Sequence, residues 1–516
     1  MSAALLAGAM PPLFSFAWIT ANAPALLVVM SLLSGPVAVL LWRGRLAWVW
    51  AVLISLLAFA LTLILYGQVI THGVVTYAMG DWAPPLGIVY RIDALNMLVL
   101  LLVAGMGLLS VVYGLPSVLR EIAPKKQALF FAAFLLNLTG LFGVSITGDA
   151  FNVFVFLEIS SISTYVLVAM GAGTDRRALT ASFNYLVLGT IGATFFVIGI
   201  GLIYMATGTL NMADITAQLH GRGDDRVVRA AFAFIVIGLG LKMAMFPLHT
   251  WLPGAYTYSP SMAGTFLAST GTKVAFYALV RFIFGVFIPG SAFDGVVFDL
   301  VLAPMAIAGM IICSVQALYQ SNIRKLLAYS SVAQLGYMLM GLSMGTAAGL
   351  SAGLLHMFNH ALMKGALFMG AGIFALTYGV RHVRDLRGMG KLMPLTSAAF
   401  TVAGLSLVGV PLFAGFVSKY YLVMAALDRG WWWAAAAVIL SSVLAIFYVG
   451  RMLEAMYLRT PATFDGKPLS PRRAPLLALV PLLILAVANI WFFFDASLPK
   501  GLTDAAAAAL LGGGTS

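Results

Sequence analysis

The sequence predicts an all-α integral membrane protein with about fourteen transmembrane helices. Of its 516 residues, 62% are hydrophobic and only 9% are charged, whereas soluble domains have roughly 25% charged residues. Apolar segments of about twenty residues, long enough to cross a hydrocarbon core of about 30 Å, recur along the whole chain. No Gly/Ser/Pro-rich linker divides it, so residues 1–516 are predicted to form a single polytopic membrane domain.

The predicted helices follow one another closely. We place them at residues 23–42, 47–67, 94–113, 127–147, 150–171, 181–206, 229–247, 261–287, 297–318, 325–346, 349–379, 395–427, 432–457 and 474–494. The apolar residues before Ala23 lack a preceding basic stretch, so we expect a short retained segment there and no cleaved signal peptide.

Basic residues in the loops predict the orientation, because Lys and Arg are enriched in cytoplasmic loops. If the N-terminus lies outside, the inner loops hold Arg43, Arg45, Arg120, Lys125, Lys126, Arg176, Arg177, Arg324, Lys325, Arg381, Arg384, Arg387, Lys391, Arg459, Lys467, Arg472 and Arg473. The outer set is smaller: Arg91, Arg222, Arg226, Arg229, Arg281, Arg429 and Lys500. This bias predicts that both termini lie on the outer side.

Several function classes are disfavoured. The formal charge of +12 lies in short loops, which does not suit nucleic-acid binding. The one cysteine, Cys313, rules out a disulfide framework or a thiolate metal site within this chain. The sequence contains no phosphate-binding loop, dinucleotide-binding turn or Ser/His/Asp set. We therefore expect no cofactor and no catalytic centre in this chain.

Two apolar segments resemble each other and each contains a Pro-Leu pair. Gly238–Pro253 reads GLGLKMAMFPLHTWLP, and Gly404–Lys419 reads GLSLVGVPLFAGFVSK. Proline removes a backbone donor, so Pro247 and Pro411 are expected to break their helices within the membrane. Paired broken helices are typical of inverted-repeat transporters; the alternative is two ordinary proline kinks.

Five charged residues lie well inside apolar segments: Glu158, Lys242, Lys273, Lys364 and Lys419. Each costs at least about 2.5–3.5 kcal/mol at the centre of a membrane helix, so each needs a partner, water or a function. Burial favours a neutral amine and a nearby carboxylate favours a charged one, which can switch a lysine between holding and releasing a proton. Satisfied ion pairs are the alternative, but one acid cannot neutralise four lysines.

His356, His360 and Lys364 are spaced i, i+4, i+8 and therefore share one helix face. Imidazole can donate and accept at neutral pH, which suits a proton relay. A zinc site and a structural polar stripe are the alternatives; no nearby acid, second cysteine or third histidine supports the metal. His249, just after Pro247, is either a further relay step or a cap for the broken helix.

Two acidic residues outside this set are expected to cap helices. Asp175 is flanked by Arg176 and Arg177 at a helix start, and Asp149 also begins a helix.

At these residues the sequence resembles the antiporter-like subunits of respiratory complex I, membrane-bound hydrogenases and Mrp-type multisubunit cation/proton antiporters. The resemblance spans residues 80–460 and is carried by the segments GDWAPPLGIVYRIDALNML, TGDAFNVFVFLEISSISTYVL, LKMAMFPLHTWLPGAYTYSP, SNIRKLLAYSSVAQLGYM, HMFNHALMKGALFM and GVPLFAGFVSK. It implies two inverted five-helix repeats, at 127–287 and 297–457, each with a broken helix.

The resemblance also implies roles for the buried residues. It places Glu158, Lys242, Lys273, His356, His360, Lys364 and Lys419 on a central proton-transfer axis. Glu158 and Lys242 would be the coupling pair, and Lys419 the terminal proton carrier. No metal site is implied.

The resemblance leaves the parent complex open. One complex I type has Glu at the position of Lys419, and another has a long C-terminal lateral helix, so both look less similar. The GDWAPPLGI stretch and the short C-terminal tail look most like the D-type subunits of Mrp antiporters. That implies a proton-translocating component of a Na⁺/H⁺ antiporter in a bacterial-type cell membrane, with homologous membrane subunits as partners and Na⁺ handled by one of them. The alternatives are a membrane-arm component of a redox complex and a structural scaffold.

Overall fold

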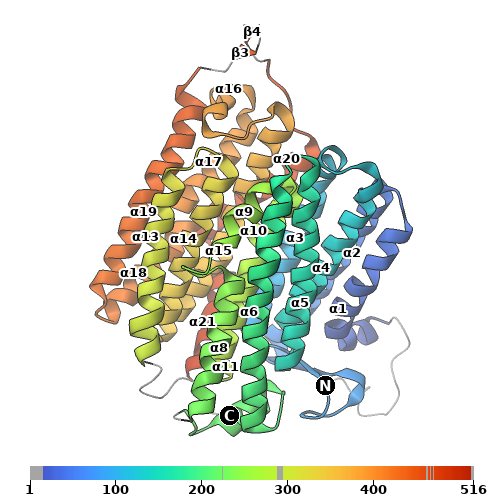
Figure 1. Cartoon of the computed structure of the whole chain (residues 1–516), viewed down its shortest axis with the longest axis vertical. Helices are drawn as coiled ribbons and strands as arrows, with labels where there is room; N and C mark the ends of the chain where they lie inside the picture. Colours follow the sequence, from blue (N-terminus) through green and yellow to red (C-terminus); the bar gives the residue numbers. More distant parts are fainter. Residues whose placement is uncertain are drawn as a thin grey trace.

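The chain forms a bundle of closely packed helices with two short hairpins (Figure 1). The computed structural model describes residues 15–223, 225–287, 295–460, 463–464, 467–468 and 470–512. The α-helices and strands are α1 Phe16–Leu40, α2 Gly44–His72, β1 Val75–Ala78, β2 Val89–Ile92, α3 Ala94–Glu121, α4 Gln127–Ile146, α5 Ala150–Ala169, α6 Arg177–Thr207, α7 Met212–Leu219, α8 Arg226–Met243, α9 Trp251–Tyr258, α10 Ser261–Ser269, α11 Gly271–Gly285, α13 Ala303–Leu318, α14 Ile323–Ser343, α15 Ala347–Tyr378, α16 Met389–Leu392, α17 Pro394–Val408, α18 Ala414–Asp428, α19 Trp432–Leu453, β3 Thr463–Phe464, β4 Lys467–Pro468, α20 Leu476–Phe494 and α21 Ser497–Leu511.

The predicted fold class is confirmed. Every predicted span overlaps helix, although residues 244–247 and 409–413 inside two of them are not helical, and 11 helical segments among the described residues are long and apolar enough to cross a membrane. The total of fourteen spans stays a prediction. Part of the difference lies in α17 and α18, which have only 15 residues each.

Two predicted spans differ in their internal structure. The seventh was predicted to end at Pro247, but helix resumes as α9 at Trp251. The eighth was predicted as one helix, 261–287, but it divides into α10 and α11 at Thr270 (φ −122°, ψ −56°). The Ser269 and Thr270 hydroxyls donate to carbonyls of the preceding turn, and Gly271 follows; both features weaken a helix without any proline.

The N-terminal segment is described only in part. Phe16–Leu40 forms α1, so the predicted first span begins earlier than Ala23. Residues 1–14 lie outside the described residues, and so does any short segment predicted there.

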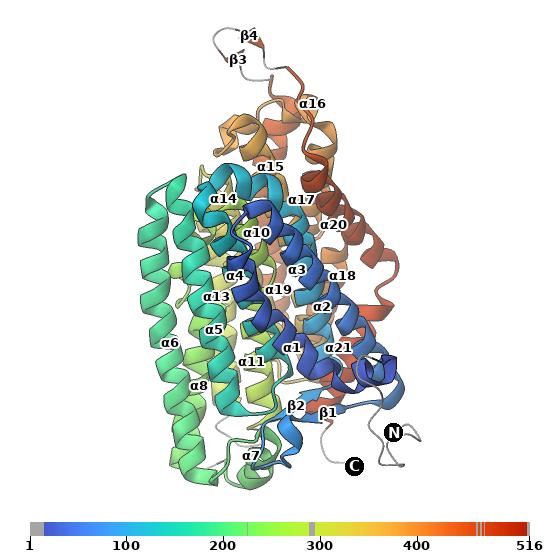
Figure 2. The same ribbon diagram turned by 90° about the vertical axis from the view of Figure 1, so that its right-hand side faces the viewer.

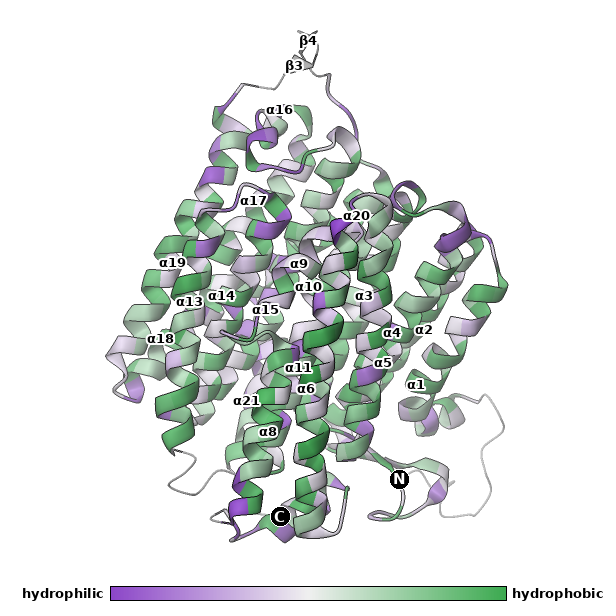
Figure 3. Cartoon of the chain, in the orientation of Figure 1, coloured by the Kyte–Doolittle hydropathy of each residue, from purple (hydrophilic) through white to green (hydrophobic). Residues whose placement is uncertain are grey.

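Apolar side chains cover the outer helices as well as the core. Leu179, Phe183 and Leu186 of α6 are exposed on the isolated chain, whereas residues 349–374 of the central helix α15 are all buried. Hydrophilic residues gather mainly at the two ends of the bundle (Figure 3). A continuous apolar exterior of this kind suits lipid rather than water.

The two ends of the bundle carry different accessory elements. α16 and the β3–β4 hairpin lie at one end, and α7 with the β1–β2 hairpin lies at the other (Figure 2). The two strands of each hairpin are antiparallel. α21 lies against the first turns of α15, where the Ser351 hydroxyl donates to Asp504 at 2.6 Å.

Glycine allows close packing between α6 and α8, the helix that positions Lys242. A Cβ atom added at Gly238 would lie 2.7 Å from the Gly192 carbonyl oxygen and 2.7 Å from the Phe196 nitrogen. Both atoms belong to the backbone, so neither can move away by changing a rotamer. Gly238 therefore fixes the separation of these two helices.

We predict that Gly238→Ala destabilises the protein by about 1–3 kcal/mol, the usual cost of overpacking. The measurement is the apparent unfolding temperature of the purified protein. Gly201→Ala on α6 is the control, because a Cβ there meets nothing within 4 Å. Equal unfolding temperatures for the two variants would contradict this interpretation of the packing.

Candidate functional site

The first helix break leaves the Lys242 side chain free to bond outside its own helix. α8 ends at Met243, and Ala244 adopts a left-handed conformation (φ 63°). Pro247 lies in the connection between α8 and α9. The carbonyl of Leu241, near the end of α8, accepts a hydrogen bond from the Trp251 indole at 2.9 Å. The same carbonyl also accepts from the Ala244 backbone N–H at 3.1 Å, and the Lys242 side chain bonds outside its own helix.

Lys242 forms an ion pair with Glu158 of α5. Its Nζ lies 3.0 Å from Glu158 Oε1 and 2.6 Å from the Ser161 hydroxyl. The Lys242 side chain is 5% exposed and that of Glu158 25%. Glu158 and Ser161 are three residues apart and so face the lysine from neighbouring turns of α5. The two sides of the predicted coupling pair are therefore in direct contact.

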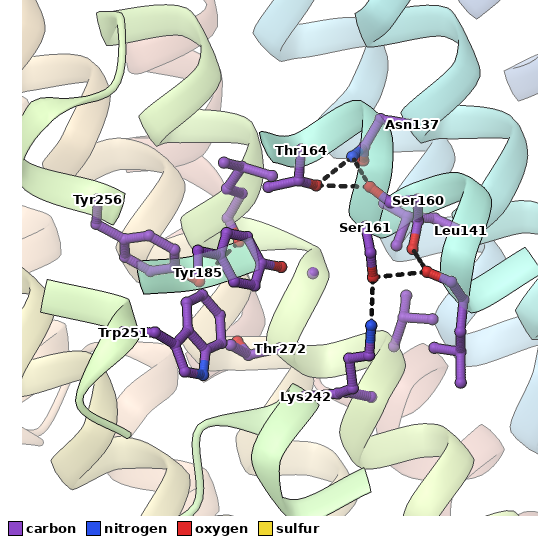
Figure 4. A pocket seen from close by; sticks show the side chains of 15 residues that line it. Asn137, Leu141, Ser160, Ser161, Thr164, Tyr185, Lys242, Trp251, Tyr256 and Thr272 are labelled. Atoms are coloured by element: carbon purple, nitrogen blue, oxygen red, sulfur yellow. Dashed lines mark hydrogen bonds between the residues drawn. The ribbon is translucent and has the colours of Figure 1, made fainter. Parts of the chain in front are cut away.

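A small cavity separates Lys242 from the α10–α11 break. Lys242 reaches Ser161 on one side of it, and Thr272 and Trp251 lie on the other (Figure 4). Asn137, Ser160 and Thr164 give the wall polar character. Thr272 directly precedes Lys273, so the cavity extends from the first lysine toward the second.

Lys273 is fully buried without a carboxylate. Its amine donates to the Ala268 carbonyl, close to the α10–α11 break, and lies 3.4 Å from the Thr272 hydroxyl. The break at Thr270 thus places an accessible carbonyl within reach of the amine. No ion pair of Lys273 occurs among the described residues.

The polar stripe on α15 is buried throughout. The ring nitrogens of His356 each lie 2.9 Å from a partner, Gln334 Oε1 and Ser418 Oγ. The His356 and His360 rings are nearly parallel, with centroids 6.3 Å apart. Neither nitrogen of His360 has a hydrogen-bond partner within the described part of the chain.

The stripe continues to Lys364 one turn further along α15. Lys364 donates to the Leu327 carbonyl at 2.8 Å and to the Ser330 hydroxyl at 2.5 Å. Both partners belong to α14, so no acidic group is involved.

Lys419 lies beside the second helix break. α17 ends at Val408, Gly409 (φ 89°) and Leu412 (φ 79°) adopt left-handed conformations, and α18 begins at Ala414. The Lys419 amine donates to the Leu407 and Val408 carbonyls and to the Ser442 hydroxyl, each at 3.0 Å. It also lies 4.7 Å from the centre of the Tyr337 ring.

Lys419 and the α15 stripe are connected through Ser418. The Ser418 hydroxyl contacts His356 on one side, and its neighbour Lys419 contacts the broken helix on the other. The structure therefore brings Lys419 close to the stripe, and joins Glu158 to Lys242 directly.

His249 lies away from this chain of contacts, between the first break and α13. Its Nε2 is 3.8 Å from Cys313 Sγ, and its ring stacks on Phe246 with centroids 5.2 Å apart. The Leu241 carbonyl of the broken helix accepts from the Ala244 N–H and the Trp251 indole, not from His249.

The two expected capping carboxylates lie at helix starts. Asp149 accepts from the Asn152 backbone N–H at 2.7 Å at the start of α5. Asp175 accepts from the Arg177 N–H at 3.0 Å, and the Arg177 guanidinium lowers the pKa of this carboxyl.

Two buried or half-buried arginines were not predicted from the sequence. Arg281, expected in an outer loop, lies within α11 and pairs with Asp93 at 2.8 Å. Arg451 of α19 donates to the Leu318 carbonyl at 2.7 Å and to that of Gln320. Both lie near the ends of apolar helices, where a charge gives no sequence signal of its own.

Comparisons with known proteins show the family of this chain. Residues 147–445 match the family described as NADH:quinone oxidoreductase/Mrp antiporter, TM. The chain is 43% identical to the N subunit of NADH-quinone oxidoreductase from Desulforudis audaxviator, over 80% of this chain and 83% of that protein. It is 31% identical to the D subunit of the Na⁺/H⁺ antiporter from Bacillus subtilis, over 75% and 77%.

A solved structure gives the same result for the fold. A chain in the Mrp complex from Dietzia superposes with a TM-score of 0.87 at 27% identity, covering 96% of this chain and 98% of that one. The protein is thus a multi-pass antiporter-like membrane subunit, and it belongs to the NADH:quinone oxidoreductase/Mrp antiporter family.

Proposed function

We propose that this chain translocates protons along the buried axis formed by Glu158, Lys242, Lys273, His356, His360, Lys364 and Lys419. The observation that carries the proposal is the Glu158–Lys242 ion pair in the same bundle as three further buried lysines, which have no carboxylate partner among the described residues. A carboxylate that approaches or leaves Lys242 changes the stability of its charged form. Such a pair can couple a structural change to proton movement.

The two histidines of the α15 stripe suit proton transfer between the buried lysine amines. His356 contacts a hydroxyl and an amide oxygen, and His360 offers two nitrogens that no described residue occupies. A neutral imidazole can accept a proton on one nitrogen and release one from the other. Lys419 then serves as the terminal carrier in this proposal, and His249 is a possible additional step.

We further propose that the chain works in a Na⁺/H⁺ antiporter with other membrane subunits, among them homologous ones. The TM-score of 0.87 to the Mrp complex chain and the match to the Bacillus subtilis antiporter protein support this assignment. Glu158 is the one carboxylate in the proposed axis, whereas a dehydrated hard cation favours several oxygen ligands. In our proposal a partner subunit therefore handles Na⁺.

A redox-driven complex is the second candidate. The 43% identity to the NADH-quinone oxidoreductase protein of Desulforudis audaxviator favours it. The buried axis would serve either complex, because its residues carry protons and hold no redox group.

The arrangement of breaks supports two inverted repeats, 127–287 and 297–457. α8 and α9 flank one break, and α17 and α18 flank the other. For the orientation, we propose that both termini face the outer side of a bacterial cell membrane; the larger set of basic loop residues then lies inside.

Removing either charge of the ion pair is expected to abolish proton translocation. We predict that Glu158→Gln and Lys242→Met reduce cation-dependent proton exchange in inverted membrane vesicles to background, while the complex still assembles. Asp149→Asn is the control: it makes the same change of carboxylate to amide at the start of α5 and keeps a good helix cap. Exchange at the normal rate in both axis variants would refute the proposal.

The Ser161 hydroxyl is expected to tune the same pair. Its bond to Lys242 at 2.6 Å is of the charge-assisted kind, worth about 1.5–3 kcal/mol. We predict that Ser161→Ala slows exchange by on the order of tenfold. Ser163→Ala is the matched control, because Ser163 donates only to the Ile159 carbonyl of its own helix. Equal rates in the two variants would show that the Ser161 bond is unimportant.

Co-purification separates the two parent complexes. Mass spectrometry of the affinity-purified native complex is expected to find other antiporter subunits. Iron–sulfur and quinone- or hydrogen-reacting proteins in stoichiometric amounts would replace the antiporter assignment with the redox one, and leave the proton axis as proposed.

A further inference from the structure

A polar cleft opens at the end of the bundle where α3, α10, α14 and α15 meet. Its volume, which includes space open to solvent, is about 1580 Å³. Its wall comes from the end of α3, the α5–α6 connection, the residues before α10, the start of α14 and the end of α15. The cleft lies outside the proton axis, and none of the axis residues lines it.

Positive charge exceeds negative charge in this cleft. Its lining contains five basic side chains and two carboxylates: Arg120, Arg177, Arg324, Lys325 and Arg381 against Glu121 and Asp175. Both carboxylates already have partners. Glu121 accepts from the backbone N–H and the hydroxyl of Ser261, and Asp175 pairs with Arg177 at 2.7 Å.

The backbone holds three of these basic residues together. Asn322 and His382 form a β-bridge. The Ile323 N–H donates to the Arg381 carbonyl at 3.0 Å, and the Val383 N–H to that of Ser321 at 2.8 Å. The segment that leads into α14 and the segment that follows α15 are therefore bonded side by side, with Arg324 and Lys325 in the first turn of α14 and Arg381 just after α15.

Arg324, Lys325 and Arg381 differ in whether their charged groups have partners among the described residues. The Arg324 guanidinium donates to the Ser259 carbonyl at 3.1 Å and to the Ser261 hydroxyl. Lys325 and Arg381 form no side-chain ion pair with any residue that the structure describes. Ser259 lines the cleft, and its buried hydroxyl has no partner among the described residues. The pKa of the Asp175 carboxyl is lowered mainly by Arg177 and further by Arg381, so this carboxylate is already shared between two cations. Like charges on neighbouring elements repel one another unless an anion joins them.

We propose that this cleft binds a phosphate-class oxyanion, held by Arg381, Lys325 and Arg324. A tetrahedral phosphate group offers at least three acceptor oxygens to donors that approach from different elements, and a guanidinium fork matches its geometry. A carboxylate has only two oxygens, so it can accept from fewer of these donors. Free phosphate and an anionic phospholipid headgroup share this chemistry, and basic pockets between membrane helices bind such headgroups.

The test compares two double variants of the purified native complex. Arg381→Gln with Lys325→Gln removes two charges from the cleft. Arg387→Gln with Lys391→Gln removes two exposed charges from the connection after α15, outside the cleft. The first readout is the apparent unfolding temperature against inorganic phosphate, with chloride at matched ionic strength. The second is native mass spectrometry after incubation of the delipidated complex with phosphatidylglycerol or phosphatidylcholine.

We expect the wild type and the outer control to respond to phosphate or to retain phosphatidylglycerol, and the cleft variant to need at least tenfold more ligand. Loss of the phosphate response alone identifies a free oxyanion, and loss of phosphatidylglycerol alone identifies a headgroup. Arg381→Lys, which keeps the charge, should restore binding. If the cleft variant does not assemble, Arg381→Gln alone carries the test. Identical behaviour of cleft and control variants overturns the proposal.

Discussion

The ion pair between Lys242 and Glu158 is the contact on which the rest of the buried site depends. A charge inside a membrane helix is costly, and a partner of opposite sign offsets part of that cost. The axis contains four lysines and one carboxylate, so only one lysine can have a carboxylate of the axis as its partner. Glu158 pairs with Lys242 at the first helix break. The other three lysine amines must be stabilised in other ways inside the same helix bundle.

Helix breaks supply much of that stabilisation. The amines of Lys273 and Lys419 donate to carbonyls near interruptions of α10–α11 and α17–α18. These carbonyls accept an amine without bringing a second charge into the membrane.

The two proline breaks are used differently. At the first, Trp251 caps the Leu241 carbonyl, and Lys242 is left free to contact Glu158. At the second, Lys419 itself bonds the Leu407 and Val408 carbonyls. The first lysine therefore responds to a carboxylate on another helix, whereas the second is held by its own broken helix. This difference fits a coupling role for one and a terminal role for the other.

Much of this arrangement could be predicted from the sequence, and the remainder has identifiable physical causes. Apolar segments predicted the membrane fold, and the i, i+4, i+8 spacing predicted the α15 stripe. The contact of Glu158 with Lys242 could not be derived, because 84 residues separate them and no local pattern reports on helix packing. The division of α10 from α11 at Thr270 could not be predicted, because no proline marks it in the sequence. Arg281 was misplaced because a charge near a helix end looks like a loop residue.

Proton conduction along the buried axis requires water or polar groups between its members. A high-resolution experimental density map of the assembled complex tests this most directly at His360, whose nitrogens have no partner among the described residues. We predict ordered water within hydrogen-bonding distance of both nitrogens, continuing toward Lys273 and Lys364. Apolar side chains packed against both nitrogens, with dry gaps on either side, would contradict this claim.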